Sequence, residues 1–278
     1  MRLKQRLGRG RTVVAGEWGQ LQAPEDVARD MEALRRALEE GRHRPSRLPQ
    51  VVARFASKVI AVADRLGLRR VQCPVCGHKA FSYRPDVAGG VVVWNSRCAG
   101  CRAAARHRLF AVVVDASASR GDVGLHLAPE RWLAEPVAAL VETVLTLDIE
   151  RAKVHVHADA QMLPFRDESV DLIVCSDVLE HIPDDALALD EFRRVLSSEG
   201  QAVIHVPVLV TKTLEYGYPD PLQHHHYRAY GPDVRDRFTA AGFSVTTSLA
   251  MGIGKRERRS AGLKVGDALF QLDRLPVS

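Results

Sequence analysis

Short apolar runs alternate with helical patterns over the C-terminal two-thirds of the chain. Five of these runs predict parallel strands, at residues 123–128, 144–147, 154–156, 170–175 and 202–206. Apolar residues at helical spacing predict one helix that ends before Gly200 and another at residues 233–241. Residues 243–249 and 268–272 predict two final strands, with a basic loop at residues 255–259 between them. This alternation is typical of an α/β protein whose parallel sheet is built from βαβ units.

The N-terminal region has a different pattern. Residues 1–20 are rich in arginine and glycine and lack an apolar period, which predicts a loose basic arm. One helix is predicted between Pro24 and Gly41 and another between Pro49 and Gly67, each with one apolar face. We expect these faces to be packing surfaces, and they could build either a homodimer interface or a lid.

Length and charge narrow the class of protein. At roughly 150 residues per domain, a chain of 278 residues predicts one large domain with an appendage. The formal net charge is +5, and the lysine and arginine excess falls mostly within residues 2–70, which predicts a solvated basic face at the N-terminus. No stretch approaches the ~20 apolar residues of a membrane helix, and the first residues lack the apolar middle of a signal peptide. We therefore expect a cytoplasmic protein without a membrane partner.

Four of the five cysteines form two close pairs, Cys73-Pro-Val-Cys76 and Cys98-Ala-Gly-Cys101. Each tight pair can direct both sulfur atoms at one metal ion, and the spacer carries a strand-like Val-Val-Val-Trp run, as in a zinc ribbon. We therefore expect Cys73, Cys76, Cys98 and Cys101 to bind Zn²⁺. Four thiolates leave no position for water or substrate, so the predicted role of the ion is structural. Ribbons can also bind nucleic acid, but this spacer is nearly uncharged.

Acidic residues stand at the ends of three predicted strands. They are Asp148, Asp159 and Asp177. Open α/β sheets bind their ligands at the carboxyl ends of their strands, so these residues predict a ligand site. Each aspartate alone could instead cap a helix or stabilise a turn. Cys175, at the end of a buried strand, is predicted to belong to the core.

Several motifs of this segment resemble those of the class I S-adenosylmethionine-dependent methyltransferases. In chain order they are Asp159-Ala160, Leu163-Pro164-Phe165, Ser169-Val170-Asp171, Asp177-Val-Leu-Glu-His181 and Leu189-Asp-Glu-Phe-Arg-Arg-Val-Leu196. The resemblance covers about 120 residues, with the motifs in register. More narrowly, Leu125-His-Leu-Ala-Pro-Glu130 and His226-Tyr-Arg-Ala-Tyr-Gly231 resemble a bacterial subgroup that places a zinc ribbon before the methyltransferase fold.

The resemblance implies the fold and the activity. It implies a Rossmann-like α/β sheet of seven strands, the last antiparallel, preceded by N-terminal helices and the small ribbon. Three regions follow: a basic arm and helices at residues 1–70, the zinc ribbon at 71–106 and the methyltransferase domain at 107–278. The implied reaction transfers a methyl group from S-adenosylmethionine to oxygen, nitrogen or carbon of a small-molecule acceptor, for example in specialised metabolism.

The resemblance also implies the cofactor contacts. Asp148, ending the second strand, would accept hydrogen bonds from the ribose hydroxyls, and Asp159, ending the third, would receive the adenine amino group. The first loop departs from the glycine-rich turn of most such enzymes, because Ala128-Pro129-Glu130 stands there. Glu130 could pair with the amino group of the methionine moiety. The implied cofactor residues are His126, Ala128, Glu130, Asp148, Asp159, Ala160, Ser176 and Asp177.

A run of histidines, His224-His225-His226, follows the fifth strand, where this fold would cover the acceptor. Histidine titrates near neutral pH and can deprotonate a hydroxyl or an amine. We expect His226, at the subgroup's signature position, to be the general base, and His225 is the second candidate. Loop histidines can instead serve structure, and methyl transfer can rest largely on positioning. Successive side chains of an extended segment point to opposite faces, so the run itself is not expected to supply three metal ligands. His181 is expected to support the cofactor loop.

Two alternatives of other classes remain. An RNA-modifying methyltransferase would hold RNA with the basic N-terminus and the ribbon, and its binding would be strongly salt-dependent. A non-catalytic scaffold with the methyltransferase fold would be folded and zinc-loaded but would bind no cofactor.

Overall fold

The computed structural model describes residues 70–86, 91–114, 120–264 and 267–275, together with isolated positions between 32 and 68. The predicted basic arm lies outside the described residues. The same holds for the two predicted N-terminal helices, apart from those isolated positions.

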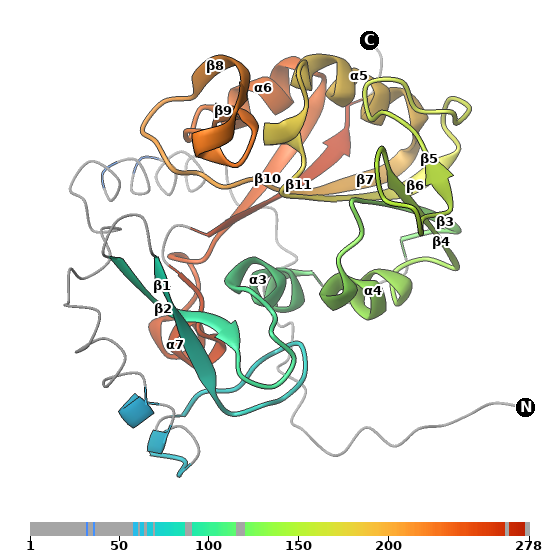
Figure 1. Cartoon of the computed structure of the whole chain (residues 1–278). Coiled ribbons are helices and arrows are strands. Elements are labelled where there is room, and N and C mark those ends of the chain that lie inside the picture. The colour runs from blue at the N-terminus through green and yellow to red at the C-terminus, as the bar shows by residue number, and fades with distance from the viewer. Residues whose placement is uncertain are drawn as a thin grey trace, which may run out of the picture.

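A seven-stranded mixed sheet forms the centre of the described chain (Figure 1). Its strands are β3 (Val123–Leu127), β4 (Thr143–Asp148), β5 (Val156–His157), β6 (Val170–Ser176), β7 (Leu196–His205), β10 (Phe243–Leu249) and β11 (Ala268–Arg274). Their spatial order is β10-β11-β7-β6-β3-β4-β5. The pairs from β5 to β7 are parallel, whereas β11 is antiparallel to both β7 and β10. The predicted seven-stranded sheet with an antiparallel last strand is confirmed.

Helices cover both faces of this sheet. They are α3 (Ala105–Val113), α4 (Arg131–Ala138), α5 (Asp185–Val195) and α6 (Val234–Ala240), whereas α7 (Lys255–Ala261) lies beside the ribbon (Figure 1), where the Ser260 carbonyl accepts the Gln72 N–H. Figure 1 shows α5 and α6 on one side of the sheet and α3 and α4 on the other. Within the described residues, no helix has the length and apolar character needed to cross a membrane.

Strand β6 shows why the sheet is covered on both sides. Leu172 and Val174 pack in the cluster that contains α3 and α4 residues, whereas Ile173 and Cys175 pack in the cluster that contains α5 and α6 residues. Successive side chains of a strand point to opposite faces, so a continuous apolar run is buried on both. Each such side chain contributes about 1.5–3 kcal/mol when fully buried. The prediction that Cys175 belongs to the core is confirmed.

The predicted loop at residues 255–259 is wrong, because these residues form helix α7. Gly254 precedes the helix, and Gly262 ends it with a φ of 64°, in the left-handed region that favours glycine. Two of its arginines lie in the last turn, where the helix dipole favours positive charge. Its sequence, Lys-Arg-Glu-Arg-Arg-Ser-Ala, lacks the apolar period that predicts a helix, so the pattern gave no signal.

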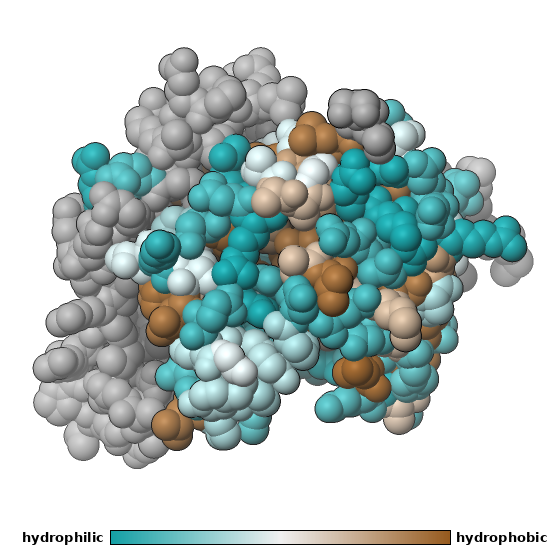
Figure 2. Space-filling view, turned by 90° about the horizontal axis from the view of Figure 1, so that it is seen from above, coloured by the Kyte–Doolittle hydropathy of each residue, from teal (hydrophilic) through white to brown (hydrophobic). Residues whose placement is uncertain are grey.

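Two antiparallel hairpins extend the fold. The ribbon hairpin pairs β1 (Phe81–Asp86) with β2 (Val91–Cys98), as the strand-like spacer predicts. The second hairpin, which the sequence pattern did not reveal, pairs β8 (Leu214–Asp220) with β9 (His226–Ala229), and its strands are joined by the short helix η2 (Pro221–Gln223). Seen from above Figure 1, the described surface is largely hydrophilic, with small, separate hydrophobic patches (Figure 2).

Candidate functional site

The four cysteines of the two predicted pairs meet in one cluster. Their sulfur atoms all lie within 4.8 Å of one another, with 3.9 Å between Cys73 and Cys101 and 3.6 Å between Cys76 and Cys98. Zn–S bonds of about 2.3 Å in a tetrahedron place sulfur atoms about 3.8 Å apart. The observed spacing and the all-thiol donor set therefore fit a zinc ion.

Two contacts fix the ribbon to the sheet domain. The Trp132 indole of α4 donates a hydrogen bond to the Cys101 carbonyl, and its ring stacks on His107 with 4.7 Å between centroids. The Arg108 guanidinium, with no exposed surface, donates hydrogen bonds to the carbonyls of Ala103, Ala261 and Gly262. Helix α3, which carries His107 and Arg108, is thus held between the ribbon and α7.

A pocket of about 650 Å³ opens at the carboxyl ends of β3, β4, β5 and β6. Six of the residues predicted to contact cofactor or acceptor line it: Ala128, Asp148, Asp159, Ala160, Asp177 and His225. Four others, His126, Glu130, Ser176 and His226, do not line it. The structure therefore brings the three strand-end aspartates together, as expected for strands that end at one edge of a sheet.

Two residues at this edge have strained backbones. Ala128 has a φ of 44° and Asp177 a φ of 52°, in the left-handed region that costs a side chain about 1–2 kcal/mol. Such strain gathers where the backbone must approach a ligand or aim a side chain. Ala128 thus adopts the conformation that a glycine of the usual turn would provide.

The Glu130 carboxylate is held by the first turn of α3. It accepts hydrogen bonds from Arg106 Nη2 at 2.6 Å and from His107 Nε2 at 2.8 Å. His107 Nδ1 accepts the Ala104 N–H, so the neutral ring carries its proton on Nε2. His126 Nε2, buried below the loop, accepts the Glu130 N–H at 3.3 Å. The side chains of Glu130 and His126 therefore hold the first loop, residues 128–130, in place through α3 and through the loop backbone.

Burial raises the pKa of Glu130, but the hydrogen bonds from His107 and Arg106 outweigh it and lower the pKa to about 2. A lowered pKa means that the carboxylate stabilises the fold above its ordinary pKa of 4.5, and that this contribution is lost as the pH falls toward about 2. We expect the free energy of unfolding to fall less steeply for Glu130→Gln than for wild type between about pH 5 and pH 3. Urea titrations at stepped pH values measure this, and equal slopes would contradict the assignment.

Asp177, in the loop that follows β6, connects this loop to α3. Its Oδ1 accepts a hydrogen bond from His205 Nδ1 at 2.6 Å, and its Oδ2 pairs with Arg106 Nε at 3.0 Å. Burial raises the pKa of Asp177, but His205 and Arg106 lower it below its ordinary value. Arg106 therefore bridges Glu130 and Asp177. Sequence reasoning missed this arginine as a site residue, and its only signal was its place in the basic run after the ribbon.

Asp148 and Asp159 are held within their own loops. Asp148 accepts the N–H groups of Glu150 and Arg151 and pairs with the Arg151 guanidinium at 3.2 Å. Asp159 accepts hydrogen bonds from the backbone and side chain of Gln161. Both carboxylates are thereby oriented at the pocket wall, where they can accept hydrogen bonds from a ligand.

Histidines gather at the other side of the pocket. His181, on the short helix η1 (Leu179–His181), lines the pocket together with His224 and His225. The ring of His226 lies edge-on to that of His181, with 4.5 Å between centroids. Burial lowers the pKa of both His181 and His226, which keeps them neutral at pH 7.

The chain is similar to known methyltransferases. Residues 130–204 match the family described as Methyltransferase domain. A probable S-adenosylmethionine-dependent methyltransferase of Mycolicibacterium smegmatis is 29% identical over 149 residues, which are 48% of this chain and 57% of that protein. The chain thus spans little more than half the length of this relative.

Solved structures were also matched. A complex of the Haloferax volcanii Trm112 methyltransferase activator with a putative methyltransferase is 17% identical, covering 57% of this chain and 85% of that one, with a TM-score of 0.42. A putative methyltransferase from Bacillus halodurans is 17% identical, covering 58% and 93%, with a TM-score of 0.38. These similarities are too low to bear on function. The family match and the relative confirm the predicted resemblance of this chain to the S-adenosylmethionine-dependent methyltransferases, with a methyltransferase domain at residues 130–204.

Proposed function

We propose that this protein transfers a methyl group from S-adenosylmethionine to a small-molecule acceptor. The observation that carries the proposal is the pocket of about 650 Å³ at the carboxyl ends of the parallel strands, with three aspartates on its wall. It lies within the usual range of small-molecule sites, about 300–1,000 Å³. The family match at residues 130–204 supports the reaction type.

The donor set of this pocket fits the polar groups of the cofactor. Ribose hydroxyls and the adenine amino group are hydrogen-bond donors, and the carboxylates of Asp148 and Asp159 are acceptors on neighbouring strand ends. Ala160, beside Asp159, leaves room for the adenine ring. The strained turn at Ala128 lets the backbone approach the cofactor from the end of β3.

Of the remaining predicted cofactor residues, Glu130, His126 and Ser176 have indirect roles, and Asp177 has a direct one. Glu130 and His126 set the shape of the first loop, because their side chains face α3 and the loop backbone rather than the pocket. Ser176 is buried at the end of β6, next to Asp177. Asp177 remains at the pocket wall, where it can receive the amino group of the methionine moiety.

The four-cysteine cluster is assigned a structural zinc ion. The sulfur spacing matches a tetrahedral thiolate site, and two of the cysteines are fully buried. A closed site of this kind supplies folding energy rather than chemistry. The proposed regions stay as predicted, with the ribbon at residues 71–106 and the methyltransferase domain at 107–278.

Asp148→Asn tests the cofactor site. The amide oxygen can still accept the Glu150 and Arg151 N–H groups, so the loop is kept while the carboxylate is lost. Calorimetric titration of the zinc-loaded wild type with S-adenosylhomocysteine should give a micromolar dissociation constant, about 8 kcal/mol. We expect Asp148→Asn to weaken binding at least tenfold, about 1.4 kcal/mol.

The matched control is Asp190→Asn, an exposed carboxylate on α5 that should leave binding unchanged. Equal affinity of the Asp148 variant and wild type would remove Asp148 from the site. If the folded wild type does not bind the cofactor at all, the scaffold alternative replaces the proposed function. The RNA-modifying alternative depends on the basic N-terminus, which lies outside the described residues, whereas the volume of the pocket supports a small-molecule acceptor.

A further inference from the structure

A buried carboxylate beside the pocket has no partner. Glu180, on η1, has 1% of its surface exposed, and neither of its carboxylate oxygens takes part in a hydrogen bond within the described chain. A buried carboxyl group whose oxygens have no hydrogen-bond partner costs about 1–3 kcal/mol, so its presence in a native structure needs an explanation. An ion is one of the few occupants that would satisfy it.

Two imidazoles complete a set of ligands around this carboxylate. His181 follows Glu180 on η1, and His226 comes from β9. One ligand atom from each of the three residues can be chosen so that all lie within 4.8 Å of one another. Bonds of about 2.1 Å place neighbouring ligands of one ion about 3 Å apart, so small side-chain rotations close the set. Two imidazoles and one carboxylate can occupy one side of the coordination sphere of a divalent transition-metal ion, which leaves its other coordination positions open.

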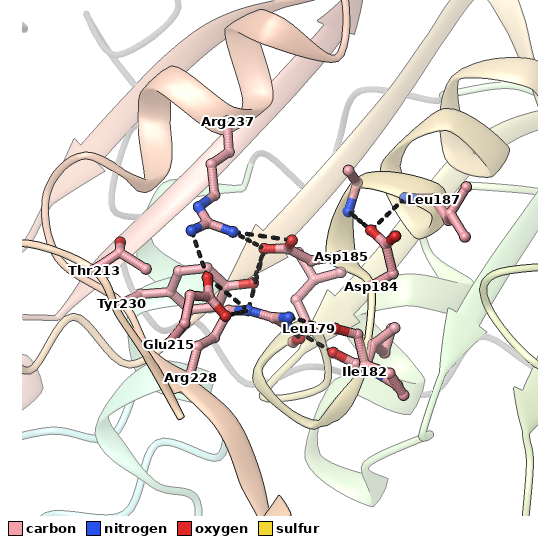
Figure 3. Close-up of polar contacts among 12 residues, drawn as sticks. Leu179, Ile182, Asp184, Asp185, Leu187, Thr213, Glu215, Arg228, Tyr230 and Arg237 are labelled. Carbon is pink, nitrogen blue, oxygen red and sulfur yellow. Dashed lines mark hydrogen bonds and ion pairs between the residues drawn. The ribbon is translucent and has the colours of Figure 1, made fainter. Parts of the chain in front are cut away.

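The segments that carry these ligands are locked together. Arg228, two residues after His226 and only 3% exposed, donates hydrogen bonds to the carbonyls of Leu179, Ile182 and Pro183, on both sides of Glu180 and His181. Figure 3 shows this arginine between the η1 loop and the hairpin.

The same network of hydrogen bonds and ion pairs includes residues of α5 and α6. Arg228 also pairs with Glu215 of β8, and the Tyr230 hydroxyl donates to Asp185 of α5. Arg237 of α6 pairs with both carboxylates, so the hairpin is tied to the helices as well as to η1 (Figure 3). The signature residues of this segment thus hold His226 in place against Glu180 and His181.

We propose that Glu180, His181 and His226 form a binding site for a divalent cation at the acceptor side of the pocket. His181 lines the pocket, so the open positions of the ion face the space beside the cofactor residues. The role of the ion rests on the proposed function: it binds an acceptor that offers a hydroxyl, or two neighbouring oxygens, and lowers the pKa of that hydroxyl. His226 is then a ligand rather than the general base of the sequence-based prediction.

The proposed step transfers the methyl group to an acceptor oxygen. The hydroxyl of the acceptor gives its proton to water or to His225, and its oxygen forms a bond to the methyl carbon of S-adenosylmethionine. The bond between that carbon and sulfur breaks with its electron pair returning to sulfur, which leaves S-adenosylhomocysteine and the methyl ether. No redox partner is required.

Manganese titration followed by electron paramagnetic resonance tests the site. The zinc-loaded protein of 278 residues is used. Mn²⁺ prefers oxygen and imidazole ligands to thiolates, so it should not replace the zinc ion of the ribbon. We expect one Mn²⁺ per chain, with binding weakened at least tenfold in both Glu180→Gln and His226→Gln. His224→Gln is the matched control, since its ring lies 6.0 Å from that of His226 and outside the ligand set, and it should bind Mn²⁺ like wild type.

Thermal unfolding provides a second readout. Mn²⁺ should raise the melting temperature of wild type, whereas Glu180→Gln, which replaces a buried carboxyl group without a hydrogen-bond partner by an amide of the same shape, should be at least as stable without metal and gain nothing from it. Wild type that binds no Mn²⁺, or binding that survives in Glu180→Gln and His226→Gln, would overturn the site. S-adenosylhomocysteine binding, measured on the same sample without manganese, reports separately on the proposed function.

Discussion

Removing the metal from the ribbon is expected to weaken cofactor binding at least tenfold, although no cysteine of the cluster touches the pocket. The path runs through α3, which begins four residues after Cys101. Its first turn supplies Arg106 and His107, which hold Glu130 and Asp177 at the ends of β3 and β6. When the ribbon loses its metal, Cys101 no longer fixes the Trp132 indole of α4, which stacks on His107 in this turn.

Calorimetric titration with S-adenosylhomocysteine before chelation, after chelation and after zinc is restored measures this effect. Cys76→Ser should reproduce the loss, because it removes one of the four ligands. Cys175→Ala is the matched control, since it removes a buried cysteine of the sheet that lies outside the cluster and should retain both zinc and cofactor. Undiminished affinity in the metal-free protein would show that α3 keeps its position without the ribbon.

Arg228→Met is expected to lower the free energy of unfolding by about 3–5 kcal/mol, because it removes the buried ion pair of Arg228 with Asp185 and the donor of three carbonyl groups. Methionine keeps much of the length of the side chain but leaves three carbonyls of the 179–183 loop without their donor. Glu215 also loses one of its two arginine partners. The hairpin that carries His226 should separate from η1.

Urea unfolding of both proteins measures this difference. Arg256→Met is the matched control, because that arginine is exposed on α7 and surface changes usually stay within about 0.5 kcal/mol. If the two variants unfolded alike, the network in Figure 3 would not be holding the hairpin. Arg228→Lys should recover only part of the stability, because one ammonium group cannot reproduce the fork of a guanidinium.

The centre of the sheet could be predicted from the sequence, because β3, β6 and the second half of β7 are buried on both faces and therefore appear as continuous apolar runs. Asp148, Asp159 and Asp177 each follow a predicted parallel strand, and the carboxyl ends of such strands meet at one edge of a sheet, so their proximity could be predicted as well. Helix α7 was missed because it has no apolar stripe, and its marked features are the left-handed Gly262 at its end and its packing beside the ribbon. A helix is predicted from the periodic spacing of its apolar residues, and the sequence of α7 has no such spacing.

The inner parts of the site were not predictable for a different reason. Arg106 contacts Glu130 and Asp177, and Arg228 contacts the loop at residues 179–183, across long stretches of chain. Such contacts arise from the topology of the sheet, which a single sequence does not display. Glu180 and His181 were visible as part of a motif, but the absence of a partner for Glu180 is a property of packing alone.

The place of β11 in the sheet has a consequence for the order of assembly. Among the residues that the structure describes, β10 pairs with β11 alone, and β11 connects it to β7. During folding, this edge of β7 therefore stays unpaired until β11, which lies far downstream in the chain, pairs with it. The ribbon is the opposite case, because its hairpin and its four cysteines are neighbours in sequence and can form early. The ribbon is thus a local unit that is able to fold first, whereas the sheet is completed last. Arg108 donates hydrogen bonds to the carbonyls of Ala261 and Gly262, and it connects the ribbon side of α3 to this late part of the chain only at the end of folding.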